Sequence, residues 1–178
     1  DPAIKNADED TPLMVASGTS ILNPLEDAGT EQERLESVKY LVEELLPAVR
    51  ERFGVSEDPV DLGVMGASFG GVASLFAAWT YPGVFGKLLL QSGSFVFTDI
   101  GHHGRSPLFD PVVQFVNAFR NDPARIGTHR VFLSCGQFES LIWFNRSLGP
   151  LLRDGGIETK FVEASDGHNW IAWRDRLR

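Results

Sequence analysis

The chain has 178 residues, 43% hydrophobic and 22% charged, which predicts one globular domain over residues 1–178, and the single cysteine, Cys135, excludes an internal disulfide and a cysteine-based zinc cluster. A net charge of -8 argues against a nucleic-acid partner, because phosphate binding needs clustered Lys and Arg. The sequence contains no run of about 18 apolar residues, the length needed to span a membrane, so we expect a soluble protein without a membrane partner. Its compartment is left open, with the cytoplasm slightly favoured.

The first helical pattern lies between residues 31 and 54. Residues 1–30 have weak periodicity and several turn formers, and only a short strand is expected near residues 14–17. From Leu35 onward apolar side chains recur at helical spacing until Gly54, which predicts a helix with a glycine cap. Pro47 falls inside this pattern and predicts a kink or an early end of the helix.

The rest of the chain alternates between strand-like and helical segments. This order is typical of a parallel sheet with helices on both faces. A connection rich in Gly, His and Pro occupies residues 93–111. We expect strands at residues 60–66, 87–91, 130–135 and 157–163, and helices at residues 70–79, 112–119 and 141–151.

The clearest chemical signal is the sequence Gly-Ala-Ser-Phe-Gly-Gly at residues 66–71, a G-x-S-x-G motif between a predicted strand and a predicted helix. A serine hydroxyl must be lifted on a tight turn to act as a nucleophile, and only small neighbours allow the backbone to pass so closely. Ser68 is therefore the predicted nucleophile, and the N–H of Phe69, at the helix N-terminus, is a predicted oxyanion donor. A tight turn without catalytic function is the alternative interpretation.

A nucleophilic serine needs a general base, and the chain offers four histidines. In this type of site the order along the chain is Ser, acid, His, with the histidine after the last strand. His168 occupies that place and is the predicted base, whereas His129 precedes a strand and is expected at the surface. His102 and His103 lie in a loop that could line a pocket.

The acid that orients the base is predicted to be Glu139, which follows the strand before the last one. Asp166, close to His168, and Asp99, after an earlier strand, are alternatives. A helix N-terminus also favours a carboxylate in the first turn, so Glu139 could have a purely structural role.

Substrate contacts are predicted from basic and aromatic side chains in the segments around these residues. Solvated charge and core packing are the ordinary uses of such residues. No spacing typical of a zinc site or of a nucleotide-binding loop is present, so we expect no metal and no cofactor. The predicted substrate-binding residues are His102, His103, Arg105, Trp143 and Trp170.

Several local motifs resemble those of the enterochelin esterase and esterase D group of α/β-hydrolases. They comprise an E-L-x-P helix, the serine turn, and P-x-x-F-G, S-x-S, G-x-x-E, N-x-x-L and G-H-x-W-x-x-W segments. The resemblance covers roughly residues 31–174. The matching segments lie at residues 43–47, 66–71, 81–86, 91–95, 136–139, 145–155 and 167–174.

The resemblance implies a doubly wound, mostly parallel α/β-hydrolase sheet and ester hydrolysis through an acyl-enzyme on Ser68, with Glu139 and His168. Relatives of this type act on siderophore trilactones, on aromatic acyl esters or on other small esters, so the expected partner is a small-molecule ester. A non-catalytic binding domain and an acyltransferase on the same fold stay open as alternatives.

One departure from the family pattern concerns the N-terminal side. The family has further strands there, and a loop after one of them supplies a second oxyanion N–H. Residues 1–30 contain no H-G or G-G pair. We therefore expect either that those strands are missing or that residues 17–19 supply the donor; loss of one donor could lower the rate by about 100-fold.

Overall fold

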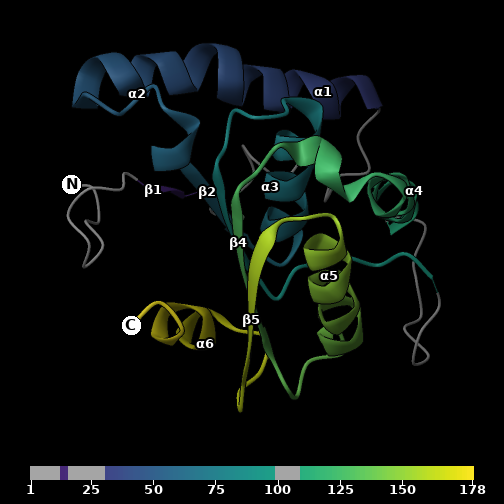
Figure 1. Cartoon of the computed structure of the whole chain (residues 1–178). Coiled ribbons are helices and arrows are strands. Elements are labelled where there is room, and N and C mark those ends of the chain that lie inside the picture. The colour runs from purple at the N-terminus through teal and green to yellow at the C-terminus, as the bar shows by residue number, and fades with distance from the viewer. Residues whose placement is uncertain (1–12, 16–30, 99–108) are drawn as a thin grey trace.

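The computed structural model describes residues 13–15, 31–98 and 109–178, and a five-stranded sheet forms its centre (Figure 1). Every neighbouring pair of strands is parallel, and the strands lie in chain order across the sheet. The predicted α/β class is therefore confirmed. The strands are β1 (Leu13–Val15), β2 (Gly63–Ala67), β3 (Lys87–Gln91), β4 (Arg130–Gly136) and β5 (Glu158–Ala164).

Helices pack around this sheet. In Figure 1, α3, α4 and α5 lie on one side of the sheet and α6 on the other, while α1 and α2 cross the end where the strands begin. None of the helices in the described ranges has the length and apolar character needed to cross a membrane. The α-helices are α1 (Glu31–Lys39), α2 (Leu46–Phe53), α3 (Phe69–Thr80), α4 (Asp110–Asn121), α5 (Ile142–Asp154) and α6 (Trp170–Asp175).

The first helical region continues through Pro47 instead of ending there. A π-helical segment, Tyr40–Leu45, separates α1 from α2, and the N–H of Leu46 bonds to the carbonyl of Leu41, five residues earlier. This wider turn lies just before the proline, which has no N–H to donate and would crowd a regular helix. Gly54 ends α2 in the left-handed conformation with φ of 64°, as predicted.

The strand predicted at residues 60–66 begins later than expected. Pro59–Asp61 forms a 3-10 turn, in which the Asp58 carboxylate accepts a hydrogen bond from the N–H of Val60. β2 therefore starts at Gly63. The apolar pattern extended the prediction into this turn because Val60 and Leu62 resemble strand residues, although Val60 is exposed.

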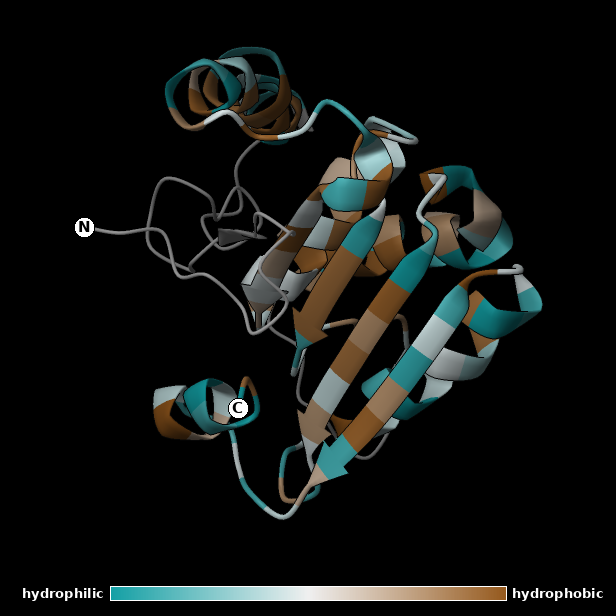
Figure 2. Cartoon of the chain, turned by 60° about the vertical axis from the view of Figure 1, so that its left-hand side comes forward, coloured by the Kyte–Doolittle hydropathy of each residue, from teal (hydrophilic) through white to brown (hydrophobic). Residues whose placement is uncertain are grey.

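The core lies between the sheet and helices α3, α4 and α5. Leu88, Leu90, Val131 and Leu133 are buried on the central strands β3 and β4. Figure 2 shows hydrophilic as well as hydrophobic residues along β5, at one edge of the sheet, and its charged residues are Glu158, Lys160 and Glu163. Such charged positions discourage edge-to-edge association. The largest fully buried side chains are Phe85, Phe95, Phe119, Phe144, Leu46, Leu62, Leu75, Leu90, Ile126, Leu133 and Leu148.

Candidate active site

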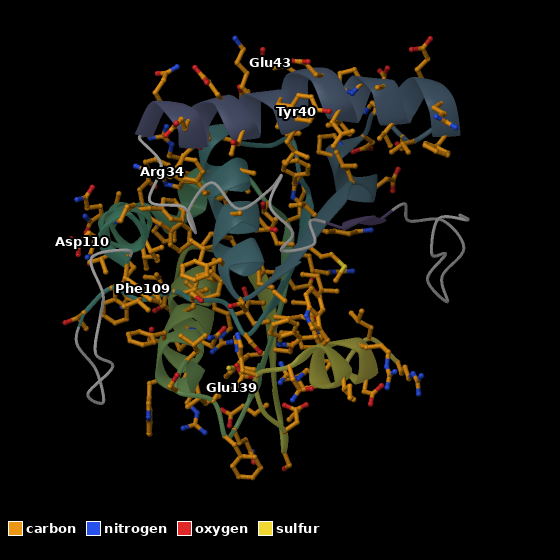
Figure 3. All side chains as sticks on the ribbon, turned by 180° about the vertical axis from the view of Figure 1, so that it is seen from behind. Arg34, Tyr40, Glu43, Phe109, Asp110 and Glu139 are labelled. Carbon is orange, nitrogen blue, oxygen red and sulfur yellow. The ribbon has the colours of Figure 1, made fainter. Side chains whose placement is uncertain are left out.

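The carboxyl ends of four neighbouring strands converge on one edge of the sheet. Ser68 follows β2, Ser92 follows β3, Glu139 lies just after β4 and His168 lies beyond β5. In parallel sheets this edge is the usual place for a ligand site. Figure 3 shows Glu139 at the end of the molecule opposite to Tyr40 and Glu43. Side chains far apart in sequence can therefore act together at this edge.

The backbone at Ser68 makes a sharp turn between β2 and α3. Ser68 has φ of 56° and ψ of -123°, a conformation that non-glycine residues rarely adopt. Gly66 makes the turn possible, because a Cβ at that position would overlap the backbone of Gly70. Serine at a helix start usually bonds to the helix N–H groups, but Ser68 makes no such capping bond. Its hydroxyl is available for another partner.

That partner is His168. Ser68 Oγ lies 3.0 Å from His168 Nε2, and His168 Nδ1 lies 2.7 Å from Glu139 Oε2. A proton on Nδ1 would be donated to the carboxylate and would leave Nε2 free to accept the serine proton. The His168 side chain is 38% exposed and that of Glu139 only 1%. The imidazole can therefore meet a substrate while its acid is shielded from water.

The Glu139 carboxylate is held by four donors. Oε2 faces His168, while Oε1 accepts hydrogen bonds from Ser92 Oγ at 2.7 Å, the Gly136 N–H at 2.7 Å and Arg176 at 2.9 Å. Burial alone would raise the pKa of Glu139, but the hydrogen bonds from His168, Ser92, Arg176 and Gly136 outweigh it and lower the pKa to about 2. The carboxylate is thus negatively charged at any physiological pH.

Asp166, the alternative acid, has a different partner. Its carboxylate bonds to the Arg176 guanidinium, with Nε to Oδ2 at 3.0 Å and a second contact to Oδ1. The other alternative, Asp99, lies outside the described residues. Of the predicted acids in the described ranges, Glu139 is the one in contact with His168.

Phe69, the predicted oxyanion donor, directly follows Ser68. Phe69 is the first residue of α3, so its N–H lies at the positive end of a 12-residue helix. Its ring packs 5.2 Å from Phe109. The segment 17–19, considered as the source of a second donor, lies outside the described residues.

The predicted substrate-binding residues differ in where they lie relative to His168. His102, His103 and Arg105 lie outside the described residues. Trp170 is 62% exposed, and its ring meets Trp173 edge to face at 4.9 Å. Trp173 in turn meets the His168 ring at 4.9 Å. Trp170 is therefore one ring away from His168.

Trp143 lies on α5 and is 56% exposed. The guanidinium of Arg146 stacks over its ring at 4.9 Å and forms two hydrogen bonds with Glu163. No contact of Trp143 with the site residues is seen in the described ranges, and its role stays a prediction. Within those ranges no group of three or more His, Cys, Asp or Glu side chains could hold a metal ion.

Three residues at this edge of the sheet were not predicted. Ser92 bonds to Glu139, Arg176 bonds to both Glu139 and Ser92, and Ser94 places its hydroxyl 3.5 Å from that of Ser68. The S-x-S segment after β3 was a usable signal for the two serines. The sequence around Arg176 carries no such signal, because a solvated arginine is the ordinary expectation.

A parallel sheet that turns sharply into a helix at a serine, with a histidine and a carboxylate beyond later strands, defines the α/β-hydrolase class. The family model described as "Putative esterase" matches residues 22–178. The chain belongs to this esterase family, as the sequence motifs indicated.

Individual relatives agree with this family. The iron(III) enterobactin esterase of Dickeya dadantii (strain 3937) is 30% identical over 139 residues, which are 76% of this chain and 32% of that protein. This chain thus spans about a third of the length of the curated relatives it matches.

Solved structures share the fold. The enterochelin esterase of Shigella flexneri gives a TM-score of 0.64 at 24% identity, covering 84% of this chain and 39% of that one. A fluorophosphonate-binding serine hydrolase of Staphylococcus aureus gives 0.62 at 18% identity, covering 99% of this chain and 83% of that one. Both likenesses establish the α/β-hydrolase fold.

Proposed function

We propose that this chain carries the catalytic part of a serine carboxylesterase, with Ser68 as nucleophile, His168 as general base and Glu139 as the orienting acid. The observation that supports the proposal most directly is the continuous line of contacts from Ser68 to His168 at 3.0 Å and from His168 to Glu139 at 2.7 Å. The expected substrate is a small-molecule ester.

Acylation follows from this line of contacts. His168 Nε2 accepts the proton of Ser68 as its oxygen bonds to the ester carbonyl carbon, and a tetrahedral oxyanion forms. The ionised Glu139 stabilises the resulting imidazolium. His168 then gives its proton to the departing alcohol, and the acyl group stays on Ser68. Deacylation repeats these steps with water, which loses its proton to His168.

The oxyanion is assigned to the N–H of Phe69. A single backbone donor of this kind contributes about 100-fold or more to the rate. Covalent labelling of a nucleophilic serine and turnover of an ester therefore test different parts of the site. The nucleophile and its base determine whether labelling occurs, whereas full turnover also needs the complete set of oxyanion donors.

A siderophore-type ester or an aromatic acyl ester is the proposed substrate within this class. Trp170 and Trp173 form a chain of rings that reaches His168, and Phe138, next to Glu139, is 77% exposed. Aromatic faces of this kind bind planar acyl groups. The name of the Dickeya relative, an iron(III) enterobactin esterase, supports the siderophore-type alternative.

The decisive experiment combines hydrolysis of p-nitrophenyl acetate with mass spectrometry after fluorophosphonate treatment. The wild-type chain is expected to hydrolyse the ester and to carry one adduct, and Ser68→Ala is expected to lose both signals. Ser37→Ala is the matched control, because the Ser37 hydroxyl bonds only to the backbone of Glu33 on an exposed helix face. A folded wild-type chain without adduct or hydrolysis would contradict the proposal.

Two further readouts refine the substrate. The kcat/KM for a p-nitrophenyl ester of an aromatic acid, relative to the acetate, is expected to fall in Trp170→Ala. An unchanged ratio would exclude Trp170 from acyl recognition. Product analysis with an added alcohol separates hydrolysis from acyl transfer, because a transferase would form the new ester in preference to the free acid.

A further inference from the structure

Arg176 is a buried cation behind the candidate triad. It follows α6 directly, and its side chain is only 5% exposed. Nε bonds to Asp166 at 3.0 Å, one terminal nitrogen to Ser92 Oγ at 2.8 Å, and the other to Glu139 Oε1 at 2.9 Å and to Asp166. A buried guanidinium is destabilising unless it is fully paired, and these contacts supply the pairing.

Two carboxylates share this one guanidinium. Glu139 contacts His168 directly, and Asp166 lies two residues before it in the same loop. Burial would lower the pKa of Arg176, but the hydrogen bonds to Asp166 and Glu139 outweigh it and raise the pKa. Arg176 thus keeps its positive charge.

Within the part of the chain that the structure describes, the other groups in contact with His168 are neutral. The Trp173 ring lies nearly perpendicular to the imidazole, and Ser68 offers a hydroxyl. Burial is the main reason that the pKa of the nearby Cys135 rises to about 12, so the thiol is uncharged. The cluster therefore contains two carboxylates and one guanidinium, with a net charge of about -1 that a protonated His168 would bring to zero.

We propose that Arg176 is a positioning residue of the esterase site: it holds Glu139 against His168 and offsets the charge of the second carboxylate, Asp166, in the loop that carries the imidazole. The inference rests on the proposed function. Without Arg176, two uncompensated carboxylates would favour the imidazolium over the neutral imidazole, and the neutral form is the one that can accept the serine proton.

Arg176 also belongs to a network of hydrogen bonds that fixes the position of α6. Arg176 and Trp173 both bond to Ser92 Oγ, and Ser92 donates its own proton to Glu139. Gln91 Nε2 donates to the carbonyl of Trp173 at 2.9 Å. The loop that carries His168 is thus attached to the ends of β3 and β4 through α6. Loss of Arg176 would loosen this attachment, which a lower plateau rate would report.

The test measures kcat/KM against pH for Arg176→Met, Arg176→Lys and Asp166→Asn. In Arg176→Met the midpoint of the acidic limb is expected to move up by about one pH unit, and in Arg176→Lys by less, because the charge is retained. Asp166→Asn removes a carboxylate and is expected to move the midpoint down. The double variant Arg176→Met with Asp166→Asn restores the charge of about -1, and its midpoint should return toward that of the wild type.

A purely structural role predicts another pattern. Each variant would lower the plateau of kcat/KM and leave the midpoint in place, and the double variant would be the least active. Arg174→Met is the control, since Arg174 is 61% exposed and bonds to Asp175 at the surface. Midpoints that stay within experimental error of the wild type in all Arg176 and Asp166 variants would overturn the inference.

An NMR titration of the His168 imidazole gives a readout that needs no activity. The signal is assigned by its loss in His168→Gln, and the titration is run in the Ser68→Ala background. Titration midpoints that move in opposite directions in Arg176→Met and Asp166→Asn support the charge effect of Arg176 on His168. This holds even if the wild type hydrolyses no ester, a result that would contradict the proposed function but not the charge effect. Serine-dependent hydrolysis with no shift refutes the role of Arg176. If Arg176→Met does not fold, Asp166→Asn still decides the question.

Discussion

Replacing Glu139 by glutamine should make the free energy of unfolding less dependent on pH in the acidic range. The pKa of this carboxyl is about 2 in the folded chain, compared with an ordinary value of 4.5. Because the folded-state value is the lower one, ionised Glu139 stabilises the fold above pH 4.5, and this contribution disappears as the pH falls toward 2. The two pKa values differ by about 2.5, which corresponds to a contribution of roughly 3 kcal/mol to the free energy of unfolding.

The assay is urea unfolding followed by circular dichroism at several pH values between 2 and 7. Between about pH 5 and pH 2 the wild-type free energy of unfolding should fall by roughly 3 kcal/mol more than that of Glu139→Gln. Glu158→Gln is the matched control, because the Glu158 carboxylate pairs with Arg130 at an exposed edge and such pairs contribute at most about 1 kcal/mol. Parallel curves for the wild type and Glu139→Gln would refute the assignment of a strongly stabilised charge at Glu139.

Two other substitutions test the frame of the site. Gly66→Ala places a Cβ against the backbone of Gly70, so it should reduce esterase activity to the level of Ser68→Ala and destabilise the chain by about 1–3 kcal/mol. The control is Gly149→Ala in α5, which should be tolerated because the nearest atom to its new Cβ lies 3.5 Å away. Normal activity of Gly66→Ala would contradict the close approach of Gly66 to Gly70. Leu133→Ala, at a fully buried position of β4, should lower the unfolding free energy by about 2–5 kcal/mol in urea titrations, and a loss below 1 kcal/mol would contradict its place in the core.

Much of the fold follows from hydrophobic patterning. The leucines of β3 form a continuous apolar run because both faces of a central parallel strand are covered, and the sequence predicted this strand at its observed bounds. The predicted start of β2 was wrong because hydrophobic periodicity cannot separate a strand from an adjacent apolar 3-10 turn. The π-helical segment before Pro47 was not predicted either, since its side-chain spacing resembles that of an ordinary helix over so short a length.

That Ser68, Glu139 and His168 lie close together was predictable, because each follows a strand and the carboxyl ends of parallel strands lie side by side. Ser68 and His168 lie 100 residues apart, but both were expected at the carboxyl edge of one parallel sheet. Arg176 and Ser92, 84 residues apart, could not be paired in this way. Their contact depends on the path of α6 after His168, and the sequence pattern there specifies a helix no better than a loop.

Backbone strain gives an independent reason to connect Ser92 with Ser68. In the described ranges these two are the non-glycine residues with positive φ, 46° at Ser92 and 56° at Ser68. Glycine would relieve the strain at either position, but it would remove a hydroxyl. The Ser92 hydroxyl donates to Glu139 and accepts from Trp173 and Arg176, three contacts that no backbone group replaces. Strain of about 1–3 kcal/mol persists where neighbouring contacts enforce it. The two strained serines therefore mark the positions at the carboxyl ends of the strands where a hydroxyl contacts the candidate triad, Ser68 through His168 and Ser92 through Glu139.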